Sequence, residues 1–595
     1  MCQWTADSQR LILEHFDMIC DSPSYIYHFA LPISPSSSWL HQYYSAEFSQ
    51  EIRVVRGVSA GWGACFRTVW FGDLWSLACW KDTIAVGRKS GSIFILNAIT
   101  GVQVAILSGH TSQVKCLIFS LDGASLVSGS EDKTIKLWDV QTGGVVKTFQ
   151  DHTGDVTSIS ISADHTTIAS GSWYKAICLW DVQTGECHHT IEQQHRVEYV
   201  CFFPLDPKHF MSVSGSKIWK WDTSGQKIAS GYDGYGIAFS PDGTQFVVYK
   251  GAAVEVYSSD SGGALAKFNM GDEHVGCCCI SPDNRVVAVG AGHDIYIWGI
   301  TGPEPHLLET LNDHARGILS LVFSSSSLIS ASHDCSVKFW QIGTPSTKPV
   351  PADPKSTPST LTLIKSITLQ AEDGIAISSH SDGMVRIWEI PTGLIKESFQ
   401  TPAKGCYQMD TRLIDGRVIS VWCIDEKMYV WDAEKGELLR TVDIPEGNII
   451  DLRISGDGSQ VFCLHFFSIR AWSIWTGDCV GEMGHSSYNV QNDILTIDGL
   501  KVWVGSKGWN FGILGSSPVE LPGMSQNWPH LYFVGGVRQQ KSFIPGIQDT
   551  ATKKVVFQLP GRLARCSDAQ WDGHYLVAGY DSGEMLILEC NYVPH

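Results

Sequence analysis

The sequence has 595 residues, a formal net charge of −18 and only 17% charged residues, so it is long enough for more than one domain. Its acidic balance argues against general nucleic-acid binding, which needs clustered lysine and arginine, and no apolar run approaches the ~18 residues of a membrane helix. The 57 glycines and 22 tryptophans favour many short strands with tight turns, and the 18 scattered cysteines predict reduced thiols in a cytoplasmic protein.

Residues 1–50 form a lead segment that differs from the rest of the chain. Residues 9–20 carry an apolar stripe with helical spacing, which predicts a helix capped by Asp7 or Ser8. The stripe consists of Leu11, Ile12, Phe16 and Ile19. The remainder of the segment is irregular and rich in proline and serine.

Residues 51–343 carry an internal repeat. A strand that usually ends in an aromatic residue recurs at intervals of 36 to 42 residues, and each unit shows about four alternating apolar runs separated by turn residues. The seven anchors are Leu96, Trp138, Trp180, Trp221, Tyr257, Trp298 and Trp340. A four-stranded unit cannot bury both of its faces alone, so the units should close into a ring. We expect an upstream strand to close it, either EIRVVRG (51–57) or CFRTVWF (65–71).

The repeat stops at residues 344–360, which carry five prolines and predict an extended linker. It then resumes over residues 361–595 in a more degenerate form. The anchors of this second half are Trp388, Trp431, Trp472, Phe511, Gln548 and Leu588. The number of blades in this second ring, six or seven, is left open by the pattern.

Repeats of about forty residues, with four strands and a terminal Trp-Asp, resemble the WD-repeat (WD40) β-propeller family. The resemblance implies an all-β fold of tandem propellers, the first seven-bladed, behind a short N-terminal helical segment. It also implies a hydrogen-bonded set of His, Ser, Asp and Trp inside a blade, which satisfies buried polar groups. Two units match this set in full: His110, Ser128, Asp132 and Trp138 in one, and His314, Ser330, Asp334 and Trp340 in the other. The unit ending at Trp388 keeps Ser378 and Asp382 without a matching histidine.

The unit ending at Trp180 departs from this pattern. It keeps His152 and Ser170, but its turn carries Trp173 and Tyr174 where the preceding unit carries Glu131 and Asp132. The aromatics are either drift of one repeat or anchors for a partner, since interface hot spots favour Trp and Tyr. Large residues at comparable turns extend the candidate partner-binding set, which comprises Trp173, Tyr174, His333, Phe466, Phe467 and Trp509.

The lead segment, together with EIRVVRG, SLACWKDTIAVG and the closing AQWDGHYLVAGYDSGEMLILEC, is similar to the C-terminal half of fungal NACHT–WD proteins of the STAND class. In that family a nucleotide-binding module precedes a repeat sensor. This sequence contains no GxxxxGK[ST] phosphate loop, so the resemblance implies a sensor without the motor, or a piece of a longer protein.

Motifs that could suggest chemistry have ordinary interpretations. Ser59 lies in a GxSxG pattern, but strand patterning follows it where a nucleophile elbow needs a helix. His188 and His189 are adjacent on a predicted strand and point to opposite faces, which disfavours a shared metal. The sequence therefore predicts no enzyme, no metal and no cofactor.

The leading hypothesis is a non-enzymatic scaffold or sensor that binds a protein partner or an intracellular cue through its propeller faces and the cleft between them. The alternatives are a regulatory arm of a STAND-type NTPase in fungal innate immunity or self/non-self signalling, and a propeller-type hydrolase. No membrane insertion is expected, and the oligomeric state is left open.

Overall fold

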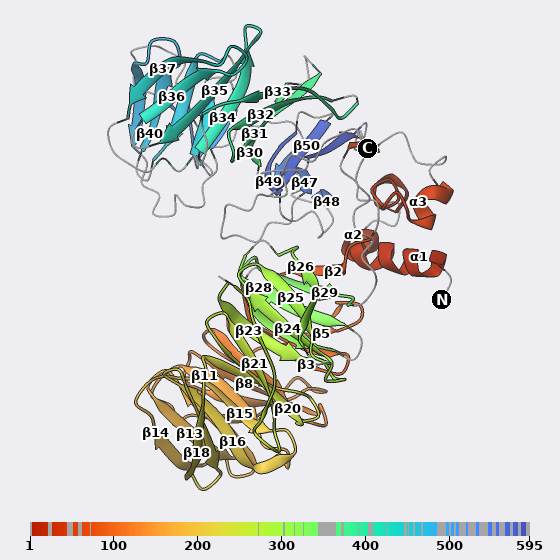
Figure 1. The fold of residues 1–595 in the computed structure, drawn as a ribbon, viewed down its shortest axis with the longest axis vertical. Coiled ribbons are helices and arrows are strands. Elements are labelled where there is room, and N and C mark those ends of the chain that lie inside the picture. The colour runs from red at the N-terminus through yellow and green to blue at the C-terminus, as the bar shows by residue number, and fades with distance from the viewer. Residues whose placement is uncertain are drawn as a thin grey trace. The chain divides into compact units, whose positions relative to one another are not determined.

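The computed structural model describes most of the chain (Figure 1). Side chains between residues 485 and 575 are outside the description even where strands are given. The residues outside the description are 1–2, 22–25, 45–51, 57–61, 72, 272, 302–303, 315, 325–326, 343–363, 371–373, 391, 403–407, 425–426, 445–448, 450, 456–457, 466–467, 485–494, 499–500, 505–506, 511–518, 522–530, 535–545, 550–554, 559–565, 572–574, 581–584 and 591–595. The Pro-rich stretch 344–360 is therefore not described.

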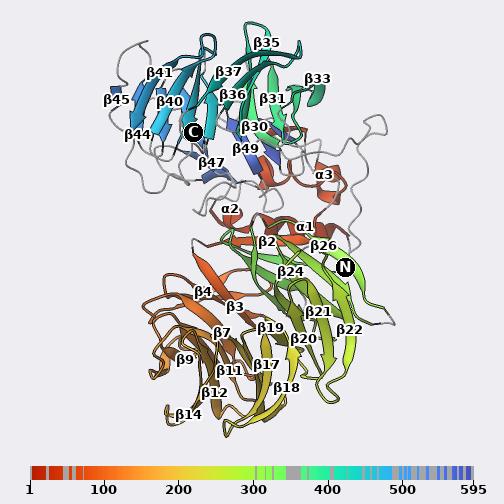
Figure 2. The ribbon, with the colours of Figure 1, turned by 60° about the vertical axis from the view of Figure 1, so that its left-hand side comes forward.

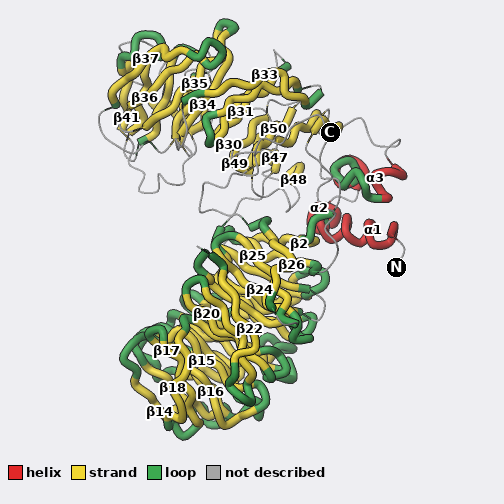
Figure 3. The backbone as a smooth tube through the Cα atoms, viewed as in Figure 1, coloured by secondary structure: helices red, strands yellow, loops and turns green. Residues whose placement is uncertain are grey.

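The chain forms two compact units. One comprises Gly63–Pro345, and the other comprises Met1–Trp62 together with Ser346–His595. Within the described residues the strands form twelve four-stranded sheets and one three-stranded sheet, all antiparallel. Figures 1 and 2 show strands throughout both units. Helices occur only in the N-terminal segment of the described chain (Figure 3).

The first propeller, Gly63–Pro345, has seven four-stranded blades, as the repeat predicted. Blades one to four are β3 (Leu74–Trp80), β4 (Thr83–Arg88), β5 (Ile93–Asn97) and β6 (Gln103–Leu107); β7 (Val114–Phe119), β8 (Ser125–Ser130), β9 (Ile135–Asp139) and β10 (Val145–Phe149); β11 (Val156–Ile161), β12 (Thr167–Ser172), β13 (Ala176–Asp181) and β14 (Cys187–Glu192); β15 (Val197–Phe203), β16 (Asp206–Ser214), β17 (Lys217–Asp222) and β18 (Lys227–Asp233). Blades five to seven are β19 (Gly236–Phe239), β20 (Gln245–Lys250), β21 (Ala253–Ser258) and β22 (Ala264–Asn269); β23 (Val275–Ile280), β24 (Val286–Ala291), β25 (Asp294–Gly299) and β26 (His306–Leu311); β27 (Ile318–Phe323), β28 (Leu328–Ser332), β29 (Ser336–Trp340) and β2 (Cys65–Trp70).

This first ring is closed by contacts and by strand exchange. Each blade's first strand packs against the first strand of the next blade, in the order β3, β7, β11, β15, β19, β23, β27 and back to β3. The upstream strand β2 pairs with β29 and completes the seventh blade. The fourth strand of the last blade thus comes from the start of the domain, so β29 is covered and the two ends of the domain are joined within one blade.

The same side-chain hydrogen bonds recur in the turns between the first and second strands of different blades. They give these hairpins the same turn length, which keeps the spacing between the two strands constant. Ser120 Oγ donates to Asp122 at 2.6 Å, and Ser240 Oγ donates to Asp242 at 2.7 Å. The following residue, Gly123 or Gly243, has φ of 72° or 70°, a left-handed conformation that glycine adopts without strain. Sequences such as SLDG and SPDG therefore fix a tight hairpin in each blade.

The N-terminal segment is helical, but not as predicted. Helix α1 (Gln3–Glu14) begins before the expected start, and α2 (Phe16–Asp21) follows it; η1 (Ile26–Ala30) and α3 (Trp39–Tyr44) complete the segment. Asp7 does not cap the first helix, because it lies inside α1 and accepts hydrogen bonds from the Trp39 backbone N–H at 2.7 Å and the Trp62 indole N–H at 2.8 Å. Asp7 thereby caps α3 and ties it to the segment entering the first propeller.

The second unit contains six described sheets. They are formed by β30 (Ile364–Gln370), β31 (Ile375–His380), β32 (Met384–Glu389) and β33 (Leu394–Gln400); β34 (Gln408–Ile414), β35 (Arg417–Ile424), β36 (Lys427–Asp432) and β37 (Glu437–Asp443); β38 (Asp451–Ile454), β39 (Gln460–Leu464), β40 (Ser468–Ser473) and β41 (Cys479–Gly484); β42 (Leu495–Asp498), β43 (Lys501–Val504), β44 (Lys507–Asn510) and β45 (Val519–Leu521); β46 (Leu531–Val534), β47 (Gly546–Asp549) and β48 (Val555–Gln558); β49 (Cys566–Trp571), β50 (Tyr575–Tyr580), β51 (Met585–Cys590) and β1 (Ile52–Arg56). The predicted anchor Phe511 lies outside the described residues.

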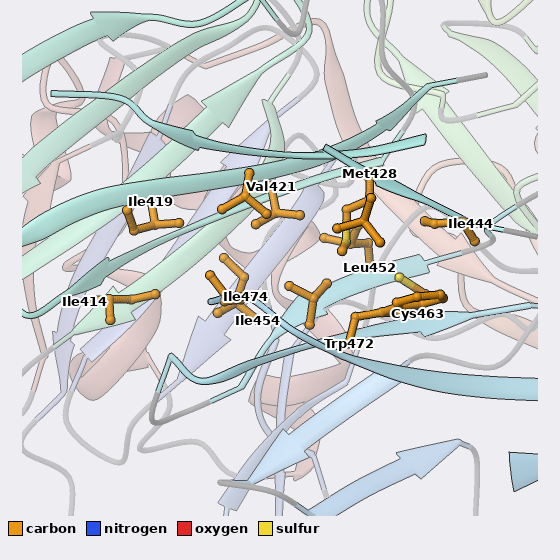
Figure 4. Packing of buried hydrophobic residues seen from close by; sticks show 13 residues of the cluster. Ile414, Ile419, Val421, Met428, Ile444, Leu452, Ile454, Cys463, Trp472 and Ile474 are labelled. Carbon is orange, nitrogen blue, oxygen red and sulfur yellow. The ribbon is translucent and has the colours of Figure 1, made fainter. Parts of the chain in front are cut away.

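The best described core of this unit lies between the blades β34–β37 and β38–β41 (Figure 4). Val421 and Met428 of one blade pack with Leu452 and Trp472 of the other, and all are buried. Each blade thus supplies one apolar face to a shared layer, the sandwich arrangement that makes closure of repeats favourable.

Strand β1 corrects the predicted boundary. Residues from 51 onward were assigned to the first propeller, but β1 pairs with β51 and completes the last described blade of the second unit. Of the two candidate closing strands, CFRTVWF closes the first ring and EIRVVRG joins the second. The first propeller is consequently inserted in the sequence of the second unit.

Candidate protein-interaction face and the blade networks

The hydrogen-bonded set expected in the second blade is present. His110 Nε2 lies 2.7 Å from Ser128 Oγ, and His110 Nδ1 lies 2.8 Å from Asp132 Oδ2. Trp138 Nε1 donates to the same Ser128 oxygen at 2.7 Å. In this series the Trp138 N–H donates to Ser128, the Ser128 hydroxyl donates to His110, and the His110 N–H donates to Asp132. Every buried donor of the set thus has an acceptor.

The seventh blade repeats this geometry. His314 bridges Ser330 Oγ at 2.6 Å and Asp334 Oδ2 at 2.8 Å, and Trp340 Nε1 donates to Ser330 at 2.7 Å. A hydroxyl also donates to the carboxylate in each set, from Thr134 to Asp132 and from Ser336 to Asp334, both at 2.6 Å.

These contacts determine the pKa of each carboxyl. Burial works to raise the pKa of Asp132, but hydrogen bonds from His110, Thr134 and the Thr111 amide outweigh it, and the pKa falls well below its usual range. Burial likewise opposes the effect of His314 and Ser336 on Asp334, whose pKa also falls. Both carboxylates are therefore charged acceptors at neutral pH.

The third blade lacks the carboxylate. His152 Nε2 still lies 2.6 Å from Ser170 Oγ, and Trp180 Nε1 still donates to that oxygen at 2.7 Å. His152 Nδ1, however, faces the Cys178 thiol, with Sγ at 3.7 Å. Burial lowers the pKa of His152 to about 4, and the Asp151 charge opposes this only in part. The histidine is therefore neutral in the folded protein.

The residues that replace the lost carboxylate and hydroxyl are Tyr174 and Ala176. Tyr174 occupies the position of Asp132, and its ring lies so close over Gly154 that a Cβ on that glycine would stand 2.4 Å from it. Ala176 occupies the position of Thr134. The blade therefore lost both the acid and its hydroxyl donor, and it gained an aromatic ring that is 64% exposed.

One histidine was missed by the sequence analysis. In the blade β30–β33, His380 Nε2 lies 3.0 Å from Ser378 Oγ, and Trp388 Nε1 donates to that oxygen at 2.8 Å. His380 comes from the same strand, two residues after the serine, and not from the loop before the blade. Its period-two spacing from Ser378 places both side chains on one strand face, a signal that could have identified it.

Other blades show the consequence of losing the serine. Trp221 keeps its bond to Ser212 Oγ at 2.8 Å. The position corresponding to Ser128 is Val289 in the sixth blade, and the buried Trp298 Nε1 there has no hydrogen-bond partner among the described residues. A strand-ending tryptophan therefore needs this serine for its N–H, although ring packing alone can hold it in place: Trp298 stacks on Phe268 with centroids 4.5 Å apart.

Trp173 is the central feature of the candidate interaction face, which we define as the turns between second and third strands of the first propeller. Its side chain is 47% exposed. Arg196, from the loop entering the fourth blade, stands over its ring at 4.6 Å, and Lys115 Nζ, from the second blade, is 5.8 Å from the ring centroid. Three blades thus converge on this one indole.

The charges around Trp173 are themselves fixed. Lys115 Nζ pairs with Glu131 at 3.0 Å and with Asp155 at 3.1 Å, and Arg196 pairs with Glu198 at 2.9 Å. Burial works to lower the pKa of Lys115, but the two carboxylates prevail and raise it, so this cation persists at neutral pH. The indole is consequently flanked by two paired cations while much of its surface faces solvent.

His333 lies on the same face, in the turn between β28 and β29. Its ring meets Trp75 edge-on with centroids 5.8 Å apart, and Lys89 Nζ lies 5.5 Å from the Trp75 centroid. Of the other predicted partner-binding residues, Phe466 and Phe467 lie outside the described residues, as does Ser59. Trp509 lies on strand β44 rather than in a turn, and its side chain is outside the description.

Comparison with known proteins agrees with the fold. The family model described as "WD domain, G-beta repeat" matches residues 101–139, 143–181, 266–299 and 305–341. Together with the closed ring of four-stranded blades, these matches identify WD repeats in the first propeller. They fall on the second, third, sixth and seventh blades, which include both complete hydrogen-bonded sets.

Individual relatives share limited parts of the chain. It is 25% identical to Autophagy-related protein 16 of Arabidopsis thaliana over 181 residues, which cover 30% of this chain and 34% of that protein. It is 28% identical to Vegetative incompatibility protein HET-E-1 of Podospora anserina over 133 residues, which cover 22% of this chain and 7% of that protein. It is 44% identical to WD repeat-containing protein pop2 of Schizosaccharomyces pombe over 66 residues, which cover 11% of this chain and 9% of that protein. The chain thus spans about a third or less of the length of these relatives.

None of the helices in the described part of the chain is long and apolar enough to cross a membrane. No group of three or more His, Cys, Asp or Glu side chains in the described residues could hold a metal ion.

Proposed function

We propose that the first propeller binds a protein partner on the face around Trp173 and Tyr174, and that the chain acts as an interaction scaffold or sensor. WD repeats indicate such a scaffold. The observation that carries the finer proposal is the half-exposed indole of Trp173, held by residues from three blades.

The physical argument concerns entropy and desolvation. An aromatic side chain that is already fixed loses little freedom when a partner covers it, so more of the burial energy appears as affinity. Tryptophan and tyrosine are also the residues most enriched at interface hot spots. The neighbouring pairs Lys115–Glu131 and Arg196–Glu198 would form a polar rim around that contact.

The test compares two variants of the full chain. Trp173→Ala/Tyr174→Ala should lose its co-purifying proteins in a quantitative pull-down from native lysate, while its melting temperature stays close to that of the parent. The matched control is Trp475→Ala, which removes another exposed indole (42%) from a turn of the second unit. Equal recovery of the same proteins by the double variant and the parent would exclude this face.

A second candidate function is favoured by one relative. HET-E-1 is named a vegetative incompatibility protein, and the lead segment resembles fungal NACHT–WD proteins. In this case the propellers would be the sensor arm of a STAND-type signalling protein. Co-purification of a nucleotide-binding module that depends on Trp173 would support this candidate, and its absence would leave the simple scaffold.

The proposal assigns no reaction to the chain, and it places binding in the cytoplasm. Every cysteine that the structure describes is a free thiol, which fits a reducing compartment.

A further inference from the structure

The blade that lost its carboxylate contains two thiols that lie next to each other on neighbouring strands. Cys178 is on β13 and is buried, whereas Cys187 begins β14 and is partly exposed. Both sulfurs approach the Thr190 hydroxyl, Cys187 Sγ at 3.5 Å and Cys178 Sγ at 3.9 Å. Cys178 Sγ also lies 3.7 Å from His152 Nδ1. Both cysteines pack in the apolar layer between the second and third blades.

The two thiols have opposite acidities. The neighbouring Cys178 thiol is the main cause that lowers the pKa of Cys187 to about 6. Thr190 helps, whereas burial and the Asp151 charge oppose the shift. The Cys187 thiol, followed by burial, raises the pKa of Cys178. Cys187 therefore combines access from solvent with thiolate character, the two conditions for a reactive cysteine.

We propose that Cys187 and Cys178 form a redox-active thiol pair, in which a hydroperoxide oxidises Cys187 and Cys178 resolves the product to a disulfide. The Cys187 thiolate attacks the peroxide, so an S–O bond forms and the O–O bond breaks; the released oxygen takes up the proton that Cys187 had given to solvent and leaves as water or an alcohol. Cys178 then attacks the Cys187 sulfur, an S–S bond forms, and the Cys178 proton leaves with the hydroxide as water. The sulfurs lose two electrons in total, and the peroxide gains them.

The chain contains a matched control for this environment. Cys479 begins β41 as Cys187 begins β14, and each lies opposite the strand-ending tryptophan of its blade, Trp472 or Trp180. Each thiol also donates to the carbonyl two residues later, Gly481 or His189. Where the third blade has Cys178 and Thr190, this blade has Arg470 and Glu482. Burial raises the pKa of Cys479.

The first measurement is the alkylation rate of each thiol in the folded full chain, followed by peptide mass spectrometry. Near pH 6 about half of Cys187 is thiolate, and a thiol with the ordinary pKa of 9.0 is ionised to only about 0.1%. Because acidic thiolates are weaker nucleophiles, the expected advantage over an ordinary thiol is roughly 20-fold at pH 6. Cys187 should therefore react faster than Cys479, although Cys479 is the more exposed of the two.

The second measurement follows the disulfide directly. Trypsin cleaves after Lys175 and Arg196, so both cysteines and no others fall in one peptide, residues 176–196. Treatment with hydrogen peroxide should give this peptide a mass lower by two hydrogen atoms and make it resistant to alkylation, and dithiothreitol should reverse both changes. Cys178→Ala should stop the cross-link and slow alkylation of Cys187 at pH 6 by about tenfold, because the neighbouring thiol that lowers the pKa of Cys187 is removed.

The outcomes are separable. A melting transition of the first propeller close to that of the parent would show that Cys178→Ala is folded, because Cys178 is buried in that unit. Cys187→Ser, at the more exposed position, gives a second variant that should also stop the cross-link. Alkylation of Cys187 no faster than that of Cys479, or an uncross-linked peptide after peroxide treatment, would overturn the proposal.

Discussion

Restoring the lost carboxylate to the third blade should stabilise the first propeller. Tyr174→Asp combined with Ala176→Thr places the acid and the hydroxyl where the second blade has Asp132 and Thr134. His152 Nδ1 would then donate to a carboxylate instead of facing Cys178. A hydrogen bond between a buried histidine and a charged group contributes about 1.5–3 kcal/mol. Because Tyr174 is 64% exposed, its removal sacrifices little burial.

The change in melting temperature follows from the size of the unit. Unfolding entropy scales with length, so each kcal/mol shifts the melting temperature of a domain this large by roughly 2 °C. The double variant should therefore melt about 3–6 °C higher at neutral pH by scanning calorimetry. Asp132→Asn, which weakens the complete set in the second blade, should shift the same transition downward and thereby identify it.

The pH dependence gives a second, independent check. In the parent the folded pKa of His152 is lowered from 6.5 to about 4, so the unfolded state binds the proton first as pH falls. The corresponding stability is intact above pH 6.5 and is lost between pH 6.5 and about 4, by about 3 kcal/mol at most. A carboxylate beside His152 raises that folded pKa and reduces the loss, so the advantage of the variant should grow on acidification. A constant or shrinking advantage between pH 7 and 5 would refute this account of the blade.

Three further predictions concern the blades. Ser128→Ala strands both the Trp138 N–H and His110, so it should lower the free energy of unfolding by about 2–4 kcal/mol, measured by urea denaturation; a loss below ~1 kcal/mol would contradict the role of this serine. Val289→Ser offers an acceptor to the Trp298 N–H, whereas the equivalent change Val248→Ser does not, because the strand-ending aromatic of that blade is Tyr257. Val289→Ser should therefore lower the free energy of unfolding by about 1 kcal/mol less than Val248→Ser. Equal losses of stability would count against the hydrogen bond. Gly123 and Gly243 have nearly the same φ, 72° and 70°, but a Cβ on Gly123 would stand 2.2 Å from the Trp80 ring and one on Gly243 would stand 3.2 Å from Pro204. Gly123→Ala should therefore lower the melting temperature more than Gly243→Ala. The reverse order would refute the steric argument.

Much of the candidate interaction face was visible in the sequence, because the repeat itself supplies a reference. Comparison of the second and third units located Trp173 and Tyr174 in a turn and identified the missing acid. The side chains that hold Trp173 could not be identified this way, since Lys115 and Arg196 come from the two neighbouring blades. The same limit applies to His152 and Cys178, which are 26 residues apart in the chain and 3.7 Å apart in the structure.

The sequence by itself determined the seven-bladed first ring and the four strands of each blade, because these depend on short-range alternation and on turn chemistry that recurs every forty residues. Both complete hydrogen-bonded sets were predicted through the resemblance to WD repeats. Only the tertiary structure decided which upstream strand closes which ring, that His380 replaces the missing histidine, and that Cys178 and Cys187 share one hydroxyl. These features depend on strand pairing across hundreds of residues and on side-chain positions at a bulge. Local patterns cannot specify them, because EIRVVRG and CFRTVWF are equally good edge strands until the partner strand is known.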